Sequence, residues 1–151
     1  TDFDFSPDGY DERQYCSPGF DLPVGSLTRT PHGRFAEYHT SADNLHFVRP
    51  ECLAESLSMY LAVLNVLENN RMYLNTNPKG EPRLGKRGLY RTMGGRVERA
   101  PDEFAMLWVL NLSDGRHSLL DIAERSALPF DSVKKAADAL AGSGLLKELE
   151  G

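Results

Sequence analysis

The clearest structural signal in this sequence lies in residues 118–149, which read SLLDIAERSALPFDSVKKAADALAGSGLLKEL. Ser118 can cap the N-terminus of a helix, and Asp121, three residues later, can complete a capping box. A second helix opens at Pro129 or Asp131, where the first pattern is interrupted. Apolar residues recur at helical spacing, so we expect an inward face formed by Leu119, Ile122, Ala123, Val133, Ala136, Ala137 and Leu140.

The flanking segments extend this pattern. Gly142 or Gly144 can end the second helix in the left-handed conformation, and residues 145–149 alternate enough for a terminal strand. Residues 101–111 are predicted to be helical and to end in a turn at Asp114-Gly115, with an inward side made of Phe104, Leu107, Trp108 and Leu112. Three helices followed by a strand is the order of a winged helix-turn-helix, which we predict for residues 100–151.

Residues 1–99 are predicted to form a separate, mixed region. Residues 50–70 give its strongest helix signal, because leucines recur at three- and four-residue steps and Pro50 suits a first helical turn. This helix is expected to bury one face on a sheet. Residues 1–25 are expected to be mainly loop, and short strands are predicted at 22–28, 35–39, 71–75 and 84–90. The predicted fold class is α+β.

Composition narrows the function classes. The chain has 151 residues and a net charge of −5, which argues against a dedicated nucleic-acid binder. No apolar run is long enough to span a bilayer, and no signal peptide is recognised, so we expect a cytoplasmic protein without a membrane partner. Cys16 and Cys52 are expected to be free thiols, since two cysteines make no disulfide framework.

Residues 38–44, Tyr-His-Thr-Ser-Ala-Asp-Asn, carry the candidate chemistry. His39 follows a predicted extended segment, and Asp43 lies four residues later. An imidazole with its own supporting carboxylate can ligate a metal ion. From the residues alone, His39 can equally be an ordinary polar-loop histidine, and Tyr38 can simply pack against its neighbours.

These residues resemble a known family. The string Tyr-His-Thr-x-x-Asp resembles the last metal-ligand motif of the co-catalytic zinc aminopeptidases, a group that includes the glutaminyl cyclases. Together with residues 11–19 (DERQYCSPG) and 22–27 (LPVGSL), it is similar to bacterial aminopeptidase-like proteins associated with surface-polysaccharide loci, which end in a winged helix-turn-helix. The resemblance runs from about Asp11 to Leu149. The sequence departs from the pattern at Glu12, where the group has His, and at Asn44, where Thr is common.

The resemblance implies specific roles. It implies that residues 1–99 are the C-terminal portion of an α/β zinc-aminopeptidase-like domain, an expectation to which the first residue, Thr1, also points. His39 would be a zinc ligand, Asp43 would orient its ring, and Asp11 would be a catalytic carboxylate beside the metal. An Asx turn is the structural alternative for Asp11. The pocket for a peptide or aminoacyl substrate would be lined by Tyr38, Arg13 and Tyr15.

Three functions compete at this level. The first is a zinc-dependent aminopeptidase-like hydrolase that is inactive as this fragment alone. The second is a DNA-reading or protein-interacting winged helix, with Ser132, Lys134 and Lys135 on its recognition helix, offset by Asp131 and Asp138. Packing or homo-oligomerisation through this unit is the preferred version, and nucleic acid is the less favoured partner. The third is a scaffold derived from a peptidase whose metal site has decayed.

Overall fold

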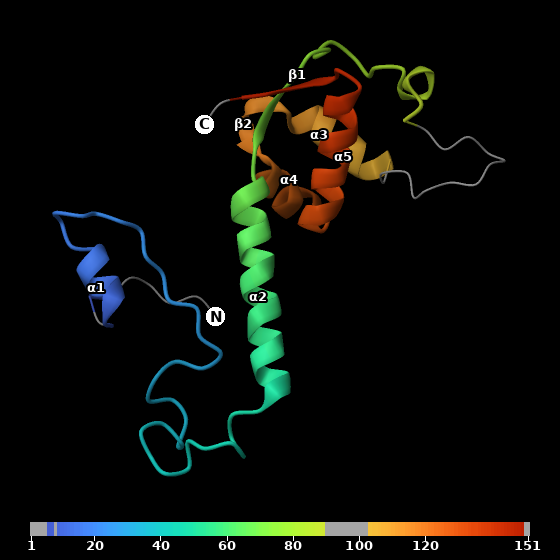
Figure 1. The fold of residues 1–151 in the computed structure, drawn as a ribbon. Helices are drawn as coiled ribbons and strands as arrows, with labels where there is room; N and C mark the ends of the chain where they lie inside the picture. Colours follow the sequence, from blue (N-terminus) through green and yellow to red (C-terminus); the bar gives the residue numbers. More distant parts are fainter. Residues whose placement is uncertain (1–5, 8, 90–102, 150–151) are drawn as a thin grey trace. The chain divides into compact units, whose positions relative to one another are not determined.

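The computed structural model describes residues 6–7, 9–89 and 103–149, and the chain divides into two units, residues 1–57 and 58–151 (Figure 1). Helix α2 (Pro50–Asn69) contributes residues to both units.

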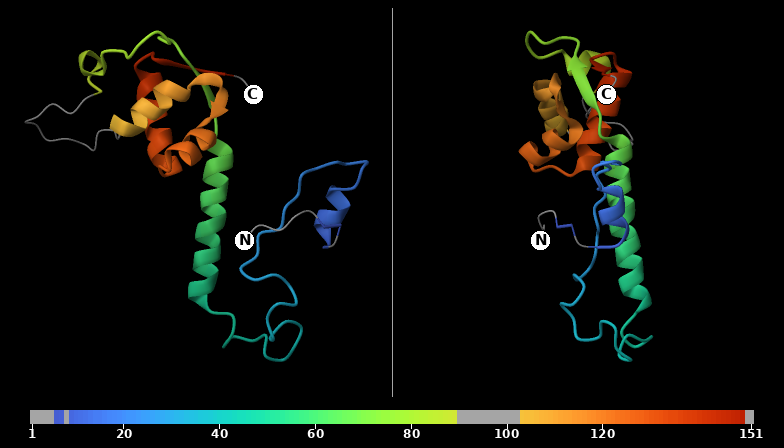
Figure 2. Two further views of the ribbon diagram at one scale, coloured as in Figure 1. Left: turned by 180° about the vertical axis from the view of Figure 1, so that it is seen from behind. Right: turned by 90° about the vertical axis from the view of Figure 1, so that its left-hand side faces the viewer.

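The second unit contains a small antiparallel sheet and three packed helices. Its strands are β1 (Met72–Asn75), β2 (Asp114–Ser118) and β3 (Leu146–Glu148), and β1 is the central strand, pairing with both others. The helices α3 (Glu103–Leu112), α4 (Leu119–Ser126) and α5 (Phe130–Gly142) contact one another, α4 contacts β2, and α5 contacts β3 (Figures 1 and 2). The predicted α+β fold class is confirmed.

The predicted ends of α4 and α5 are confirmed by their hydrogen bonds. Ser118 Oγ accepts from the Asp121 N–H at 3.2 Å, and the Asp121 carboxylate accepts from the Ser118 N–H at 2.7 Å, which completes the capping box. Pro129 caps α5 without a side-chain bond. Gly144, at φ +73°, follows α5 and turns the chain into β3. Short-range chemistry therefore places both helices correctly.

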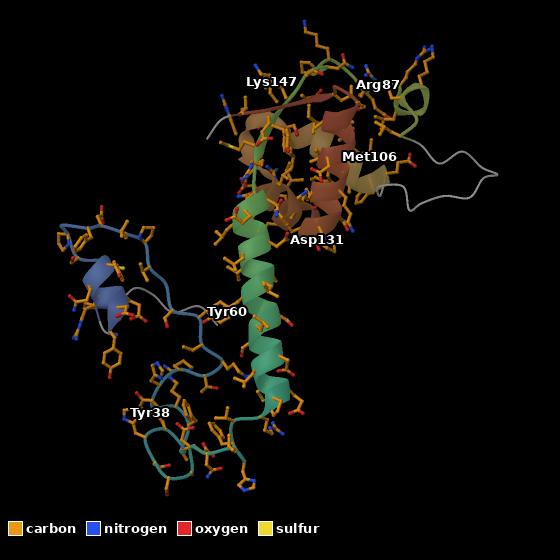
Figure 3. All side chains as sticks on the ribbon, in the orientation of Figure 1. Tyr38, Tyr60, Arg87, Met106, Asp131 and Lys147 are labelled. Carbon is orange, nitrogen blue, oxygen red and sulfur yellow. The ribbon has the colours of Figure 1, made fainter. Side chains whose placement is uncertain are left out.

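The hydrophobic core lies in this second unit. Figure 3 shows Met106 among the packed helices, and its side chain is fully buried. The predicted inward residues of α4 and α5 are all buried. The largest fully buried side chains among the described residues are Leu84, Met106, Val109, Leu119, Ile122, Val133, Leu140 and Leu145.

The predicted inward side of α3 is right for Leu112, which is buried, and for Trp108, which packs against the core, but it is wrong for Phe104 and Leu107. Phe104 is 55% exposed and Leu107 is 38% exposed, whereas Ala105, Met106 and Val109 are buried. This helix reads EFAMLWVLNL and is apolar on nearly every side. The hydrophobic pattern therefore cannot select a face, and packing against α4 and α5 makes the choice.

The strands were predicted with mixed success. The strand predicted at 71–75 is β1, and the terminal strand is β3. The turn expected at Asp114-Gly115 begins strand β2, and the described part of 84–90 contains a 3₁₀-helix, η1 (Leu84–Arg87), instead of a strand. The predicted boundary between residues 99 and 100 lies outside the described residues. Because β1 and buried Leu84 belong to the packed core, the second unit takes essential parts from ahead of that boundary.

Helix α2 forms as predicted from Pro50, but it contains no buried residue in the described structure. The expectation that it buries one face on a sheet is therefore wrong for the described residues. Its leucines are between 52% and 67% exposed: Leu53, Leu57, Leu61, Leu64 and Leu67. Among the described helices, none is both long enough and apolar enough to cross a membrane.

The described part of the first unit is built mainly from turns. Helix α1 (Asp11–Tyr15) is a short helix within the stretch that was expected to be loop. Residues 22–28 and 35–39, predicted as short strands, are irregular or turn-forming. Both cysteines are free, as predicted.

Candidate functional site

The candidate histidine belongs to a cluster of stacked rings, labelled at Tyr38 in Figure 3. The ring of His39 lies on that of Tyr38, with centroids 4.0 Å apart and planes 17° apart. Tyr38 also contacts His32 at 5.2 Å and Phe35 at 5.5 Å, and Phe35 stacks on Phe47 at 5.7 Å. We call these five residues the ring cluster. The structure therefore brings His39 and Tyr38 together, and it holds both imidazoles of the cluster against one phenol ring.

The sequence interpretation missed most of this cluster. His32, Phe35 and Phe47 are not among the candidate residues that the sequence pattern indicates. The available signal was spacing, since His32, Phe35 and Tyr38 follow one another at three-residue steps, which aligns side chains in a chain of tight turns.

The segment around His39 is built from consecutive turns. Thr40 Oγ1 donates to the carbonyl of Glu37 at 2.9 Å and accepts the N–H of Ala42 at 3.2 Å. Asn44 Nδ2 donates to the carbonyl of Ser41, while Asn44 Oδ1 accepts the N–H of His46 at 2.9 Å. Asn44, a departure from the family pattern, is thus used to close a turn.

His39 itself has a left-handed backbone conformation, with φ of +57°. A residue with a Cβ adopts this conformation at a cost, so His39 is held there by the turns on either side. Its side chain is exposed, and neither ring nitrogen has a hydrogen-bond partner among the described residues. An exposed imidazole with free nitrogens can still bind a metal ion.

Asp43 lies in the turn after His39. Its backbone N–H donates to the carbonyl of Thr40 at 3.1 Å, and its side chain is exposed. Within the described residues, no hydrogen bond joins its carboxylate to the His39 ring. Its role in orienting His39 stays a prediction.

Helix α1 carries three of the candidate residues. Asp11, Arg13 and Tyr15 are all exposed on it, and no contact with the ring cluster is found for them in the described part of the chain. For Glu12, on the same helix, an electrostatic effect of His32 is the smallest of the causes that lower the pKa of its carboxyl.

Glu12 has a clear structural task. Hydrogen bonds from its own backbone N–H and from that of Tyr10 hold the pKa of the Glu12 carboxyl below its usual value, with smaller contributions from Ser26 and His32. Gly9 stands at φ +104°, and a Cβ there would come within 2.7 Å of Glu12 Oε2. Glu12, the other departure from the family pattern, therefore caps the tight turn before α1.

The described residues alone do not fit a zinc centre. Among them, no group of three or more His, Cys, Asp or Glu side chains could hold a metal ion. A protein zinc site needs at least three such ligands. His39 is available as one of them, and any further ligands would have to come from outside the described residues.

Comparison with known proteins divides the chain in two. Residues 71–148, just over half of the sequence, match the family model for a winged helix-turn-helix. The chain belongs to the winged helix-turn-helix family. That match begins immediately before β1, in agreement with the central place of β1 in the sheet. Residues 1–70 match a family described as "Domain of unknown function (DUF4910)".

Two longer relatives resemble this winged helix-turn-helix protein over nearly its whole length. One, from Clostridium acetobutylicum, is named "Putative polysaccharide biosynthesis protein with aminopeptidase-like domain" and is 58% identical over 144 residues. A solved structure, described as a "putative peptidase" from the same organism, superposes with a TM-score of 0.82 at 54% identity. These matches cover 95% and 96% of this chain, and the chain spans about a third of each relative.

Proposed function

We propose that residues 1–70 belong to a zinc-dependent aminopeptidase-like hydrolase, in which His39 is one metal ligand. The observation that carries the proposal is the 58% identity with a protein named for an aminopeptidase-like domain, over a region that includes the exposed, unpaired His39 ring. In such a hydrolase, bound zinc would polarise a peptide carbonyl and activate water. Since the described residues form no metal centre, we derive no reaction step from them.

The remaining candidates keep supporting roles in this proposal. Tyr38 holds the His39 ring by stacking, which limits the directions in which the imidazole can point. Asp43, in the exposed turn after His39, would orient that ring, and Asp11 on α1 would act as a catalytic carboxylate. Arg13 and Tyr15, also exposed on α1, would line the pocket for a peptide or aminoacyl substrate together with Tyr38. As in other metal sites, a fixed ring orientation is needed before a histidine can bind tightly.

The test is zinc content, measured in the longest natural polypeptide that contains this chain. Zinc is expected in the unaltered protein and in His46→Ala, the matched control from the same unit, and it is expected to be lost in His39→Ala. Turnover of an aminoacyl anilide should follow the zinc. A metal-free unaltered protein, or full zinc retention in His39→Ala, would overturn the assignment. The 151-residue chain alone is expected to show no turnover.

For the winged helix-turn-helix unit, we propose that it contacts another protein surface rather than binding DNA. On α5, which would present the recognition residues, Lys134 Nζ is paired with Asp138 at 2.7 Å, and Asp131 accepts a hydrogen bond from Asn65 at 2.9 Å. Pairing of Lys134 with an acid of the same helix leaves α5 less positive charge to offer to phosphates.

Fluorescence anisotropy with a labelled DNA duplex tests this second proposal. We expect weak binding that the double substitution Lys134→Ala plus Lys135→Ala leaves unchanged. Tight, strongly salt-dependent binding that this substitution abolishes would instead establish DNA recognition.

A further inference from the structure

Helix α2 carries an apolar stripe that remains exposed in the described structure. At about 100° per residue, five of its leucines fall within a sector of about 120° on one side of the helix. These leucines are between 52% and 67% exposed: Leu53, Leu57, Leu61, Leu64 and Leu67. We call them the leucine stripe. Proteins that work as monomers rarely expose a contiguous apolar surface of this kind, so the stripe indicates a contact with another surface.

The polar contacts that attach α2 to the second unit use a different side of the helix. Asn65 Nδ2 donates to Asp131 Oδ1 on α5 at 2.9 Å, and Asn70 Oδ1, directly after α2, accepts the N–H of Leu120 on α4 at 2.9 Å. Asn65 lies about 100° around the helix axis from Leu64, in the middle of the stripe. The end of α2 is therefore held to α4 and α5 by amide groups, and these bonds leave the leucine stripe uncovered.

The part of the chain ahead of β1 has no core of its own. Among the described residues that precede Tyr73, none is buried, and the hydrophobic core begins at Tyr73. Helix α2 also falls within the match to residues 1–70, whereas the match to the winged helix-turn-helix begins at residue 71. A stretch of this length without buried apolar side chains cannot offset the entropy lost on folding. Its apolar side chains therefore need a surface that lies elsewhere.

Two possible partners suit the leucine stripe badly. Helices that lie on a membrane surface carry Lys and Arg on their polar side, and α2, which reads PECLAESLSMYLAVLNVLEN, has neither. A second copy of α2 could pair with the first as a coiled coil, but 20 residues make fewer than three heptads. Coiled coils are recognised by about three or four heptads or more. Neither a lipid surface nor a pair of α2 helices is therefore the favoured partner.

The lengths of the relatives favour a third partner. The chain spans about a third of each of the two Clostridium acetobutylicum proteins, and each match covers nearly all of this chain. One of the two is named for an aminopeptidase-like domain. In polypeptides of that length, the part outside the match is large enough to form a packed domain with an apolar surface of its own.

We propose that the leucine stripe of α2 is an interface between domains, and that it packs against the aminopeptidase-like part of a longer polypeptide that residues 1–151 do not include. The partner surface is apolar, with a cationic side chain opposite Glu68, which lies beside the stripe in the last turn of α2. Helix α2 thereby connects two domains, through its leucines on one side and its amides on another. This inference rests on the proposed aminopeptidase-like identity of residues 1–70, but on neither zinc nor His39.

The test compares the 151-residue chain with the longest natural polypeptide that contains it, both carrying Cys16→Ser and Cys52→Ser. A single cysteine replaces either Leu64, in the stripe, or Ala62, which is exposed on the opposite side of α2, and its rate of reaction with a maleimide is measured. Both cysteines should react at similar rates in the 151-residue chain. In the longer polypeptide, Leu64→Cys should react at least about tenfold more slowly, and Ala62→Cys should keep its rate.

Hydrogen exchange of the unaltered proteins checks this result without a substitution in the stripe. The amides of α2 should exchange at least about tenfold more slowly in the longer polypeptide than in the 151-residue chain. Unchanged exchange, or equal maleimide rates for Leu64→Cys in the two proteins, would overturn the inference.

The remaining outcomes separate this inference from its alternatives. Slow reaction of Leu64→Cys in the 151-residue chain itself would overturn the inference. If that rate depended on concentration, the stripe would belong to an interface between two copies, and otherwise it would be covered by the chain itself. A zinc-free longer polypeptide that still shields Leu64→Cys would overturn only the role proposed for His39.

Discussion

Oδ1 of Asp114 lies 3.0 Å from Nδ1 of His117, and the same oxygen accepts the backbone N–H groups of Arg116 and His117. One exposed carboxylate thus closes the turn that starts β2. This relationship links the local structure of the strand to the ionisation of a single side chain.

Acid should weaken that link in a defined pH window. The pKa of Asp114 is lowered from 3.8 to about 2, so its contribution to stability is complete above pH 3.8 and is lost as the pH falls towards 2. The melting temperature of the unaltered chain should therefore exceed that of Asp114→Asn at neutral pH, and the difference should shrink below pH 3.8. A constant difference across this range would contradict the assignment.

The capping box of α4 should be measurable in stability. Ser118→Ala removes the acceptor for the Asp121 N–H and is expected to lower the free energy of unfolding by about 1 kcal/mol. Urea denaturation of the chain measures this loss. Glu124→Ala, at an exposed position of the same helix, is the control and should change stability by less than about 0.5 kcal/mol. Equal effects of the two substitutions on the free energy of unfolding would show that the capping box does not stabilise α4 measurably.

Two leucines should differ sharply because one is buried and the other is not. Leu140 on α5 is fully buried, and Leu140→Ala is expected to cost about 2 to 5 kcal/mol. Leu61 on α2 is 56% exposed, and Leu61→Ala should cost less than about 1 kcal/mol in the same chain. Thermal and urea unfolding of both variants tests this. A large loss for Leu61→Ala would mean that α2 packs against something in solution.

The backbone of His39 provides a test that is independent of metal binding. At φ +57° a glycine is not strained, whereas an alanine is. Since both substitutions delete the ring stacked on Tyr38, His39→Gly should be more stable than His39→Ala by about 1 kcal/mol. Equal stability, measured by urea unfolding, would show that the turn relaxes when the ring is removed.

The sequence by itself determined the features that depend on neighbouring residues. The Ser118–Asp121 cap, the breaks at Pro129 and Gly144, the inward faces of α4 and α5 and the start of α2 at Pro50 are all present as predicted. Each depends on atoms within one or two turns of the chain, so pattern and local hydrogen bonding are sufficient. The stacking of His39 on Tyr38 likewise depends only on residues that are neighbours in the sequence.

Only the tertiary structure decided the features that join distant segments. Strand β1 lies between β2 and β3, which follow it by about forty and seventy residues, and no local pattern specifies those partners. The buried side of α3 is chosen by the helices it meets, because its own sequence is apolar nearly all round. The stacking of Phe35 on Phe47 likewise forms where separate turns of the chain meet, and no local pattern specifies that pair.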